Sequence, residues 1–438
     1  MAKGMGRLFT NMGWLLGGRG INAVLSLVYL ALATRTLGLE GFGNFAIIVA
    51  LGQTVSGLAS FQTWQFIVRW GAGSGPDDMK AATEATGFAI ALDLLSIALG
   101  TVLAAVLCYT AQYWLPLSTE LLWVAFGYCI ISLLALRSTP IGLLRLRFDY
   151  RRATTAEATQ PIVRTACAVL AAVFFPTVAG FVLAWAIAEI CVAGALWFAA
   201  ARRERIDLSR ISLRNVPRSH PDAWGFVWST NFTESLNISA KHVLLLLVGA
   251  IGGEAFAGGF RVASQLGQAL VQLAQTISKA IYPELVHAKD DAVRIAQRMA
   301  YIALGGGIFA VVLALMFGRL IIETIAGEPL GGVYWTMVII AIAGAIELVG
   351  ASLQSLLVSA GRAGTALIAR AIPMALGFAL LEFAMGWQGL KGAALTMLGS
   401  SALAVIGFWI AILSLQSIKI TVEPPAGKDA PEPSPDPR

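Results

Sequence analysis

The hydrophobic residues of this chain fall into long runs that are separated by short polar stretches. Each run is long enough to form a helix across the roughly 30 Å hydrocarbon core of a bilayer, which takes about 20 apolar residues. The pattern predicts an all-α, polytopic membrane protein of about twelve transmembrane helices. The runs cover residues 13–34, 43–68, 84–111, 116–144, 154–175, 177–201, 224–250, 256–286, 299–326, 333–360, 364–386 and 388–417.

The composition agrees with this prediction. Hydrophobic residues make up 57% of the chain and charged residues 13%, whereas a soluble domain has roughly 45–50% and about 25%. The four cysteines all lie within apolar runs, so we expect small core residues and no disulfide framework. The first run continues without a break from Trp14 to Leu37. This length favours a retained first helix over a cleaved signal peptide.

The basic residues of the connections indicate the orientation in the membrane. Lys and Arg concentrate in alternate connections, and the remaining connections contain almost none, which predicts that both termini are cytoplasmic. Arg35 and Lys391 are the exceptions to this alternation. The basic connections are 145–152, 202–220 and the stretch with Lys289, Arg294 and Arg298, and the others include 112–119, 174–180 and 249–255.

One phrase occurs twice in the chain. "GNFAIIVALGQ" at 43–53 and "GGFRVASQLGQ" at 258–268 both read G-x-F-x-x-x-x-x-L-G-Q, at an offset of 215 residues. The offset is about half the chain, which favours a duplication over chance. The two copies begin the second and eighth predicted helices, which cross the membrane in the same direction. We therefore expect two six-helix bundles that are related by a pseudo-two-fold axis along the membrane normal.

The same pattern divides the chain into four parts. The long basic connection separates the two bundles, and the Pro-rich polar C-terminal tail is expected to be disordered. The predicted parts are an N-terminal bundle (1–201), a basic cytoplasmic linker (202–223), a C-terminal bundle (224–417) and a disordered cytoplasmic tail (418–438).

The sequence contains no pattern that indicates an enzyme. It has no G-x-x-x-x-G-K-[ST] phosphate-binding loop, so direct use of ATP by this chain is not expected. The three histidines, His220, His242 and His287, are scattered and form no zinc-binding pattern. We therefore expect no cofactor, no metal site and no nucleic-acid partner.

Polar residues inside the eighth predicted helix form a stripe. Six of them recur at spacings of 4, 3, 4, 3 and 4, which places them on one face of a helix. Because unpaired polar groups are costly in lipid, this face should line a water-filled cavity or pair with a neighbouring helix. The stripe consists of Arg261, Gln265, Gln268, Gln272, Gln275 and Lys279.

Other predicted helices also contain polar and charged residues. A charge at the bilayer centre costs about 2.5–3.5 kcal/mol on insertion scales, so each is a functional candidate. Arg164 and Arg370 have an alternative, since both could reach the cytoplasmic interface with their long side chains. The candidates for substrate binding are Arg19, Asn22, Arg164, Asn237, Lys241, Arg261, Gln265, Gln268, Gln272, Lys279 and Arg370, and those for ion coupling are Asp93, Glu234 and Glu347.

These residue types favour an anionic solute that also carries hydroxyl groups. Arginine forks suit phosphate oxygens, and the amides of Gln and Asn suit the hydroxyl groups of sugars. We expect a head group that bears phosphate and sugars, with its lipid tail left in the bilayer.

The stretch "ATRTLGLEGFGNFAIIVAL" (33–51) resembles the second-helix opening of polysaccharide-biosynthesis flippases, and "GEAFAGGFRVASQL" (253–266) is similar to the opening of their eighth helix. These flippases belong to the multidrug/oligosaccharidyl-lipid/polysaccharide exporter superfamily. The resemblance implies alternating access and a cationic central cavity, in which Arg19 and Arg261 occupy places similar to arginines implicated in lipid II flippases. This chain departs from the family at Lys241-His242, where many relatives carry an acid.

The resemblance implies a flippase of the bacterial inner membrane for polyprenyl-pyrophosphate-linked oligosaccharide units, in O-antigen, capsule or exopolysaccharide synthesis. Polysaccharide polymerases and chain-length proteins are the protein partners that it suggests. A multidrug exporter of the same superfamily is one alternative, although organic cations would favour acids in the cavity. An oligosaccharide polymerase is another, but the predicted external loops are short.

Overall fold

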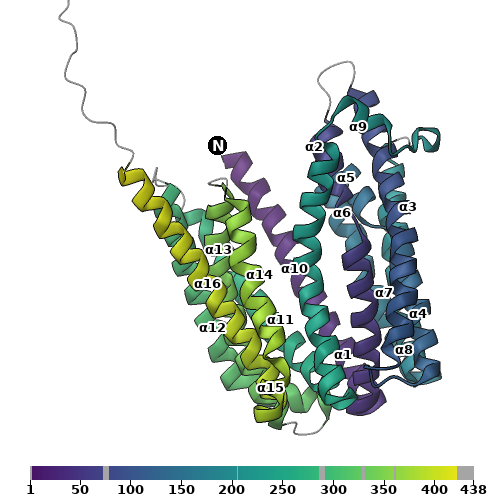
Figure 1. Cartoon of the computed structure of the whole chain (residues 1–438), viewed down its shortest axis with the longest axis vertical. Helices are drawn as coiled ribbons and strands as arrows, with labels where there is room; N and C mark the ends of the chain where they lie inside the picture. The colour runs from purple at the N-terminus through teal and green to yellow at the C-terminus, as the bar shows by residue number, and fades with distance from the viewer. Residues whose placement is uncertain are drawn as a thin grey trace, which may run out of the picture.

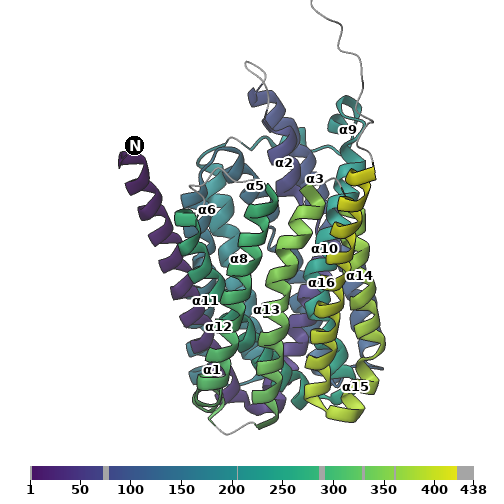
Figure 2. The same cartoon turned by 90° about the vertical axis from the view of Figure 1, so that its left-hand side faces the viewer.

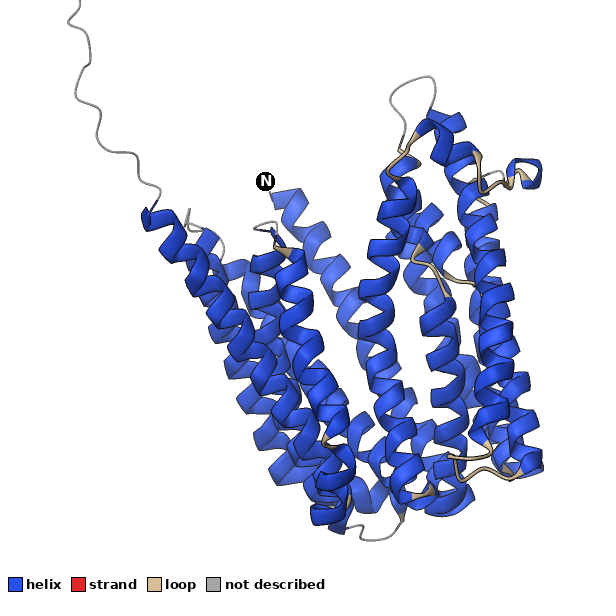
Figure 3. Ribbon diagram, viewed as in Figure 1, coloured by secondary structure: helices blue, strands red, loops and turns tan. Residues whose placement is uncertain are grey.

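A computed structural model of the chain describes residues 2–72, 78–204, 206–285, 292–327, 331–359 and 362–421. The described residues are almost entirely helical, and Figure 3 shows no strand among them. The helices are α1 (Ala2–Ala59), α2 (Thr63–Trp70), α3 (Asp78–Ala111), α4 (Thr119–Leu134), α5 (Ser138–Leu146), α6 (Tyr150–Glu157), α7 (Thr159–Phe174), α8 (Val178–Ala201), the short η2 (Leu208–Arg210), α9 (Asn215–Ser219), α10 (Ala223–Gly252), α11 (Glu254–Leu285), α12 (Ala292–Ala326), α13 (Gly331–Ser359), α14 (Ala363–Ala379), α15 (Leu381–Gln388) and α16 (Leu390–Thr421).

Each of the twelve predicted spans coincides with one of these helices or with a broken pair, so the all-α membrane fold is confirmed. Judged by length and apolarity alone, seven described helices could cross a membrane, or eight with the bent pair α14 and α15. One of the seven, Leu25–Trp70, contains two spans, because α1 bends at Gly38. The remaining spans are α7, which has 16 residues, and the more polar α10 and α11.

The repeat is visible in the backbone. Gly38 has φ 68° and ψ 179°, and Gly253 has φ 83° and ψ −177°. These two glycines are 215 residues apart, and each precedes one copy of the repeated phrase. Only glycine adopts this backbone conformation without strain. The two halves of the chain therefore begin their second helix with the same turn.

The two copies also touch each other reciprocally. A Cβ atom on Gly43 would lie 1.8 Å from the carbonyl oxygen of Glu254, and one on Gly258 would lie 2.4 Å from that of Leu39. Each pair is related to the other by the 215-residue offset. The contact between α1 and α11 thus has the symmetry of a two-fold axis between Gly43 and Gly258.

The helices diverge toward one end of the molecule and converge toward the other (Figure 1). The start of α1 and the end of α16 both lie at the open end, together with α2 and α9, and Figure 2 shows the same arrangement from the side. The predicted basic linker 202–223 contains η2 and α9. The predicted tail lies outside the described residues from position 422 onward.

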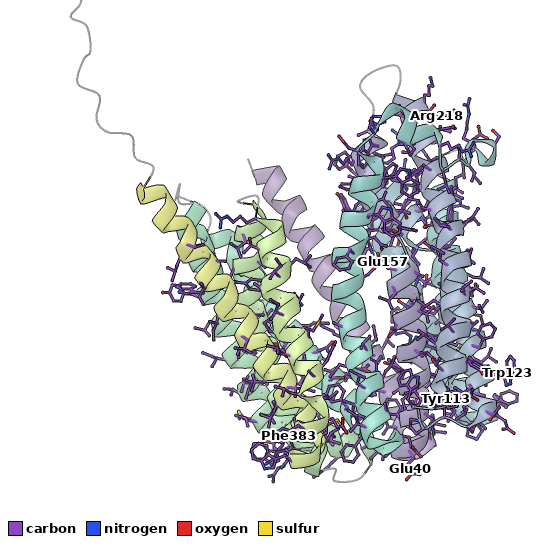
Figure 4. All side chains as sticks on the ribbon, viewed as in Figure 1. Glu40, Tyr113, Trp123, Glu157, Arg218 and Phe383 are labelled. Atoms are coloured by element: carbon purple, nitrogen blue, oxygen red, sulfur yellow. The ribbon has the colours of Figure 1, made fainter. Side chains whose placement is uncertain are left out.

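Exposed aromatic residues mark the converging end. Tyr113, Trp123 and Phe383 are 76%, 72% and 76% exposed, and Figure 4 shows all three far from Arg218 at the other end. Aromatic side chains gather where membrane meets water. The aromatic belt and the basic connections therefore lie at opposite ends, as expected for a protein that spans a bilayer.

Arg35, an exception to the charge pattern, has a structural explanation. Its Nε donates to the carbonyl of Ile325 at 3.3 Å, and its guanidinium also donates to the carbonyl of Thr324. These carbonyls lie in the last turn of α12, where they lack partners within the helix. A cation at a helix C-terminus is favourable. Arg35 thus caps α12 from the end of the first span.

Candidate functional site

Two cavities lie within the membrane-spanning part of the molecule. The N-terminal cavity has a volume of about 470 Å³ and is lined mainly by α1, α4, α5, α7 and α8. The C-terminal cavity has a volume of about 380 Å³ and is lined mainly by α10, α11, α13, α14 and α16. His242 and Arg261 line both cavities. These two residues therefore stand where the cavities of the two halves meet.

The N-terminal cavity is built around two interruptions in helices. One separates α1 from α2 at residues 60–62, and the other separates α4 from α5 at residues 135–137. The second has a local cause in Pro140, whose ring would clash with the carbonyl of residue 136 in a continuous helix. Near the start of α5 a proline is tolerated, because no helical bond is required there. The interruptions place polar backbone and side chains beside the cavity.

Glu189 of α8 is the centre of a charged cluster in this cavity. Its side chain is 4% exposed and forms ion pairs with Arg137 and with Arg164, the latter at 3.3 Å between Nη2 and Oε1. The amide of Gln160 also donates to Glu189 at 3.0 Å. Because two arginines share one acid, the cluster carries a net positive charge, which favours an anion nearby.

Unused donors accompany this cluster. The guanidinium of Arg164 lies 3.6 Å from the centre of the Trp185 ring, a cation–π contact. Arg164 Nε and Trp185 Nε1 are both buried and have no hydrogen-bond partner among the described residues. A buried donor without a partner is costly. Both residues line the N-terminal cavity, where a bound solute could supply the missing acceptors.

The C-terminal cavity contains cations and much apolar surface. Arg370 donates to Gln354 Oε1 at 3.2 Å, and Ser401 donates to Glu347 Oε1 at 3.2 Å. Lys241 is exposed and lines the cavity with Arg261. Among the described residues, no acid lies within ion-pairing distance of either. The rest of the lining includes Phe260, Met374, Phe378, Met397, Val405 and Phe408.

The polar stripe on α11 divides between the two roles expected of it. Arg261 and Gln268 line a cavity, whereas Gln265 pairs with Tyr29 of α1, with 2.7 Å between Nε2 and the hydroxyl oxygen. Gln272 is exposed. Gln265 therefore joins two helices across the interface between the halves.

Several predicted site residues fall where side chains are not described. Arg19 and Asn22 lie on the first part of α1, and the helices α10 and α11 contain the others. Their side chains are outside the described part of the structure, so the expected proximity of Glu234 and Arg19 stays a prediction. The residues concerned are Arg19, Asn22, Glu234, Asn237, Gln275 and Lys279.

The structure adds residues that the sequence reading passed over. Arg137 and Trp185 line the N-terminal cavity, and Glu189 holds the charged cluster together. Arg137 had a signal in the sequence, as an arginine inside the predicted span 116–144. Trp185 had none, because tryptophan is common in apolar spans. In the described part of the chain, no three His, Cys, Asp or Glu side chains come together as a metal centre would require.

The fold is similar to that of solved membrane transporters. An inward-facing multidrug resistance MATE family transporter of the MOP superfamily superposes with a TM-score of 0.68 at 15% identity, and the match covers 91% of this chain and 96% of that one. The lipid II flippase MurJ, in an inward closed conformation, gives a TM-score of 0.68 at 12% identity over 95% of this chain and 94% of that one. MOP is the multidrug/oligosaccharidyl-lipid/polysaccharide exporter superfamily, so the fold implied by the resemblance is confirmed.

Sequence comparison gives the family. The inner membrane protein YghQ of Escherichia coli (strain K12) is 29% identical over 332 residues, which cover 73% of this chain and 92% of that protein. The model of the family described as polysaccharide biosynthesis protein matches residues 8–289, more than half of the chain. This multi-pass membrane protein therefore belongs to the polysaccharide biosynthesis protein family.

Proposed function

We propose that this protein is a flippase that moves polyprenyl-pyrophosphate-linked oligosaccharide units across the inner membrane by alternating access. The units would serve O-antigen, capsule or exopolysaccharide synthesis. The observation that carries the proposal is the position of Arg261, which lines both cavities and has no acidic partner among the described residues. Family membership and the fold shared with a lipid II flippase support the same class of solute.

The charge of the cavities suits a pyrophosphate. Five basic side chains line the two cavities, against three acidic ones. In a low-dielectric site such an excess of cations is costly unless an anion joins it. Guanidinium groups bind phosphate oxygens with paired hydrogen bonds, which a drug-like cation could not accept. The basic residues are Arg137, Arg164, Lys241, Arg261 and Arg370, and the acids are Asp93, Glu189 and Glu347.

The two cavities differ in a way that suits the other parts of the solute. The N-terminal cavity presents Gln53, Gln62 and Gln160 together with several serines, whose side chains match sugar hydroxyls. The C-terminal cavity presents the apolar residues named above, which match the first units of a polyprenyl chain. With the pyrophosphate at Arg261, the sugars would extend into the N-terminal cavity.

The direction of transport follows from the orientation. We place the diverging end, which carries the basic connections and both termini, in the cytoplasm. The cavities would then be reached from the cytoplasmic side, where lipid-linked units are made. Export requires the helices to close at this end and part at the aromatic end.

Substitution of Arg261 tests the proposal. Arg261→Ala should abolish polysaccharide output in a deletion strain that depends on the plasmid copy, because the pyrophosphate loses its central cation. Arg319→Ala is the matched control, since Arg319 is exposed and lies over the Tyr334 ring outside both cavities. Immunoblots of membranes must show both variants at the wild-type level.

The same strain separates the alternatives. A flippase defect leaves lipid-linked units on the cytoplasmic side, whereas loss of a polymerase leaves them outside. Loss of drug resistance with normal polysaccharide would indicate a multidrug exporter. Normal output from Arg261→Ala at wild-type membrane levels would refute the role of this residue in binding.

A further inference from the structure

Three oxygen-bearing side chains from three helices form a closed ring in the N-terminal half. Thr139 Oγ1 of α5 lies 2.5 Å from Asp93 Oδ2 of α3 and 3.0 Å from Thr63 Oγ1 of α2. Thr63 Oγ1 in turn lies 3.3 Å from Asp93 Oδ1. All three residues are buried, with Asp93 3% and Thr139 0% exposed. The ring has three links and no water-exposed member.

The number of protons decides the state of this ring. Each link needs one proton between its two oxygens, and the two hydroxyl groups supply only two. With an ionised Asp93, one of the three links therefore joins two oxygens that have no proton between them. With a protonated Asp93, the carboxyl donates to Thr139, Thr139 donates to Thr63, and Thr63 donates back to the carboxyl. Only the protonated acid completes the ring.

The ring lies where the two interrupted helices meet. Thr63 is the first residue of α2, and Thr139 is the second residue of α5. The amide of Trp64 donates to Ser138 Oγ at 3.1 Å, which joins the two helix starts directly. A Cβ atom on Gly142 would lie 2.8 Å from Trp64 Cα, so α2 and α5 also cross closely. The proton on Asp93 therefore holds three helices together.

Asp93 also lines the N-terminal cavity, so water in the cavity can exchange protons with it. Arg137, at the start of α5, is the charged residue that α5 adds to this lining. The parts of α1, α2 and α4 that line the cavity add no charged side chain. The remaining charged or titratable residues of the lining are Arg164, Glu189, His242 and Arg261.

We propose that Asp93, with Thr63 and Thr139, is a proton-binding site whose occupancy controls the packing of α2, α3 and α5 around the N-terminal cavity. Binding converts the carboxylate and one proton from cavity water into the neutral acid, and release returns that proton to cavity water. The protonated ring fixes the starts of α2 and α5 against α3. Loss of the proton leaves a buried carboxylate with one unmet link, which favours separation of these helices. The site does not depend on the identity of the solute, so it goes beyond the proposed function.

Infrared spectroscopy of the purified protein tests proton binding directly. The wild type in lipid nanodiscs should show the carbonyl band of a protonated carboxylic acid, which disappears as the pH is raised. Asp93→Asn should remove that band, whereas Glu347→Gln, which changes the acid of the other cavity, should leave it. A spectrum that is identical in wild type and Asp93→Asn at every pH would overturn the proposal.

Thermal unfolding tests the coupling to packing. Asn carries one donor and one acceptor, as the protonated acid does, so Asp93→Asn should melt at the same temperature at every pH. The wild type should lose stability as the pH rises through the same range in which the infrared band disappears. Thr139→Ser keeps the hydroxyl and should behave as the wild type, whereas Thr139→Val opens the ring and should lose the pH dependence.

Sodium provides the last arm of the experiment. A melting temperature that rises with sodium chloride, but not with potassium chloride, at constant pH would mean that the ring binds a metal cation, if Asp93→Asn abolished the effect. That result would overturn proton binding. None of these measurements uses a lipid-linked solute, so they stand independently of the export assay with Arg261→Ala.

Discussion

Replacing Gly43 by alanine should push the two repeats apart where they touch. The new Cβ atom would stand 1.8 Å from the carbonyl oxygen of Glu254 and 2.5 Å from the carbonyl carbon. Real Cβ atoms essentially never come closer than 3.0 Å to such atoms, so the gap must widen by about 1.2 Å. The obstacle is backbone of α11, which cannot rotate out of the way as a side chain could.

The energetic cost can be estimated from the two effects of the substitution. Overpacking of this kind costs about 1–3 kcal/mol, and a clash with backbone belongs at the upper end. Alanine in place of glycine inside a helix returns about 1 kcal/mol. The net loss is therefore about 2 kcal/mol, which lowers the ratio of folded to unfolded protein roughly 30-fold. Gly258→Ala should cost less, because its closest approach, to Leu39, is 2.4 Å.

The assay is thermal unfolding of purified protein in one detergent, followed by size-exclusion chromatography of a fluorescent fusion. Gly194→Ala is the matched control, because this glycine also lies within a helix and its Cβ would meet no atom within 4 Å. The control should melt at or slightly above the wild-type temperature. If Gly43→Ala melted together with Gly194→Ala, the repeats would not be in contact at Gly43 and the proposed axis would be wrong.

Three further substitutions test single contacts in the same unfolding assay. Arg35→Ala uncaps α12 and should cost about 1 kcal/mol, and a variant as stable as the wild type would contradict the cap. Tyr29→Phe removes only the hydroxyl bonded to Gln265, and should also cost about 1 kcal/mol. Glu189→Ala leaves two buried arginines unpaired and should cost about 3–5 kcal/mol. Glu189→Gln should fall between Glu189→Ala and the wild type, and equal stability of all three would exclude a structural role for the ion pairs.

The sequence predicts the fold well because its signals are periodic or repeated. The apolar runs locate the spans, since a bilayer requires about 20 apolar residues whatever the neighbouring helices are. The 215-residue offset was seen in letters that include Gly43 and Gly258. The structure shows why these letters are the same in both halves, because the two helices approach each other too closely there for any other residue.

The partners of polar residues are much harder to predict. The stripe on α11 fixes a face of the helix, yet Gln265 turns to Tyr29 while Arg261 and Gln268 line a cavity. Spacing within one helix gives the direction of a side chain and leaves open what lies opposite. The pairing of Glu189 with Arg137 joins residues on two helices that are 52 positions apart. Such pairs depend on how helices pack, which periodicity does not determine.

The interruptions in the helices show where a local signal is ambiguous. Pro140 and Pro373 both lie inside predicted spans. The helix breaks just before Pro140, whereas α14 continues through Pro373. A proline removes one hydrogen bond in either case, so the difference must come from what the break makes possible. Before Pro140 it brings Thr139 to Asp93, a bond that only the folded bundle offers.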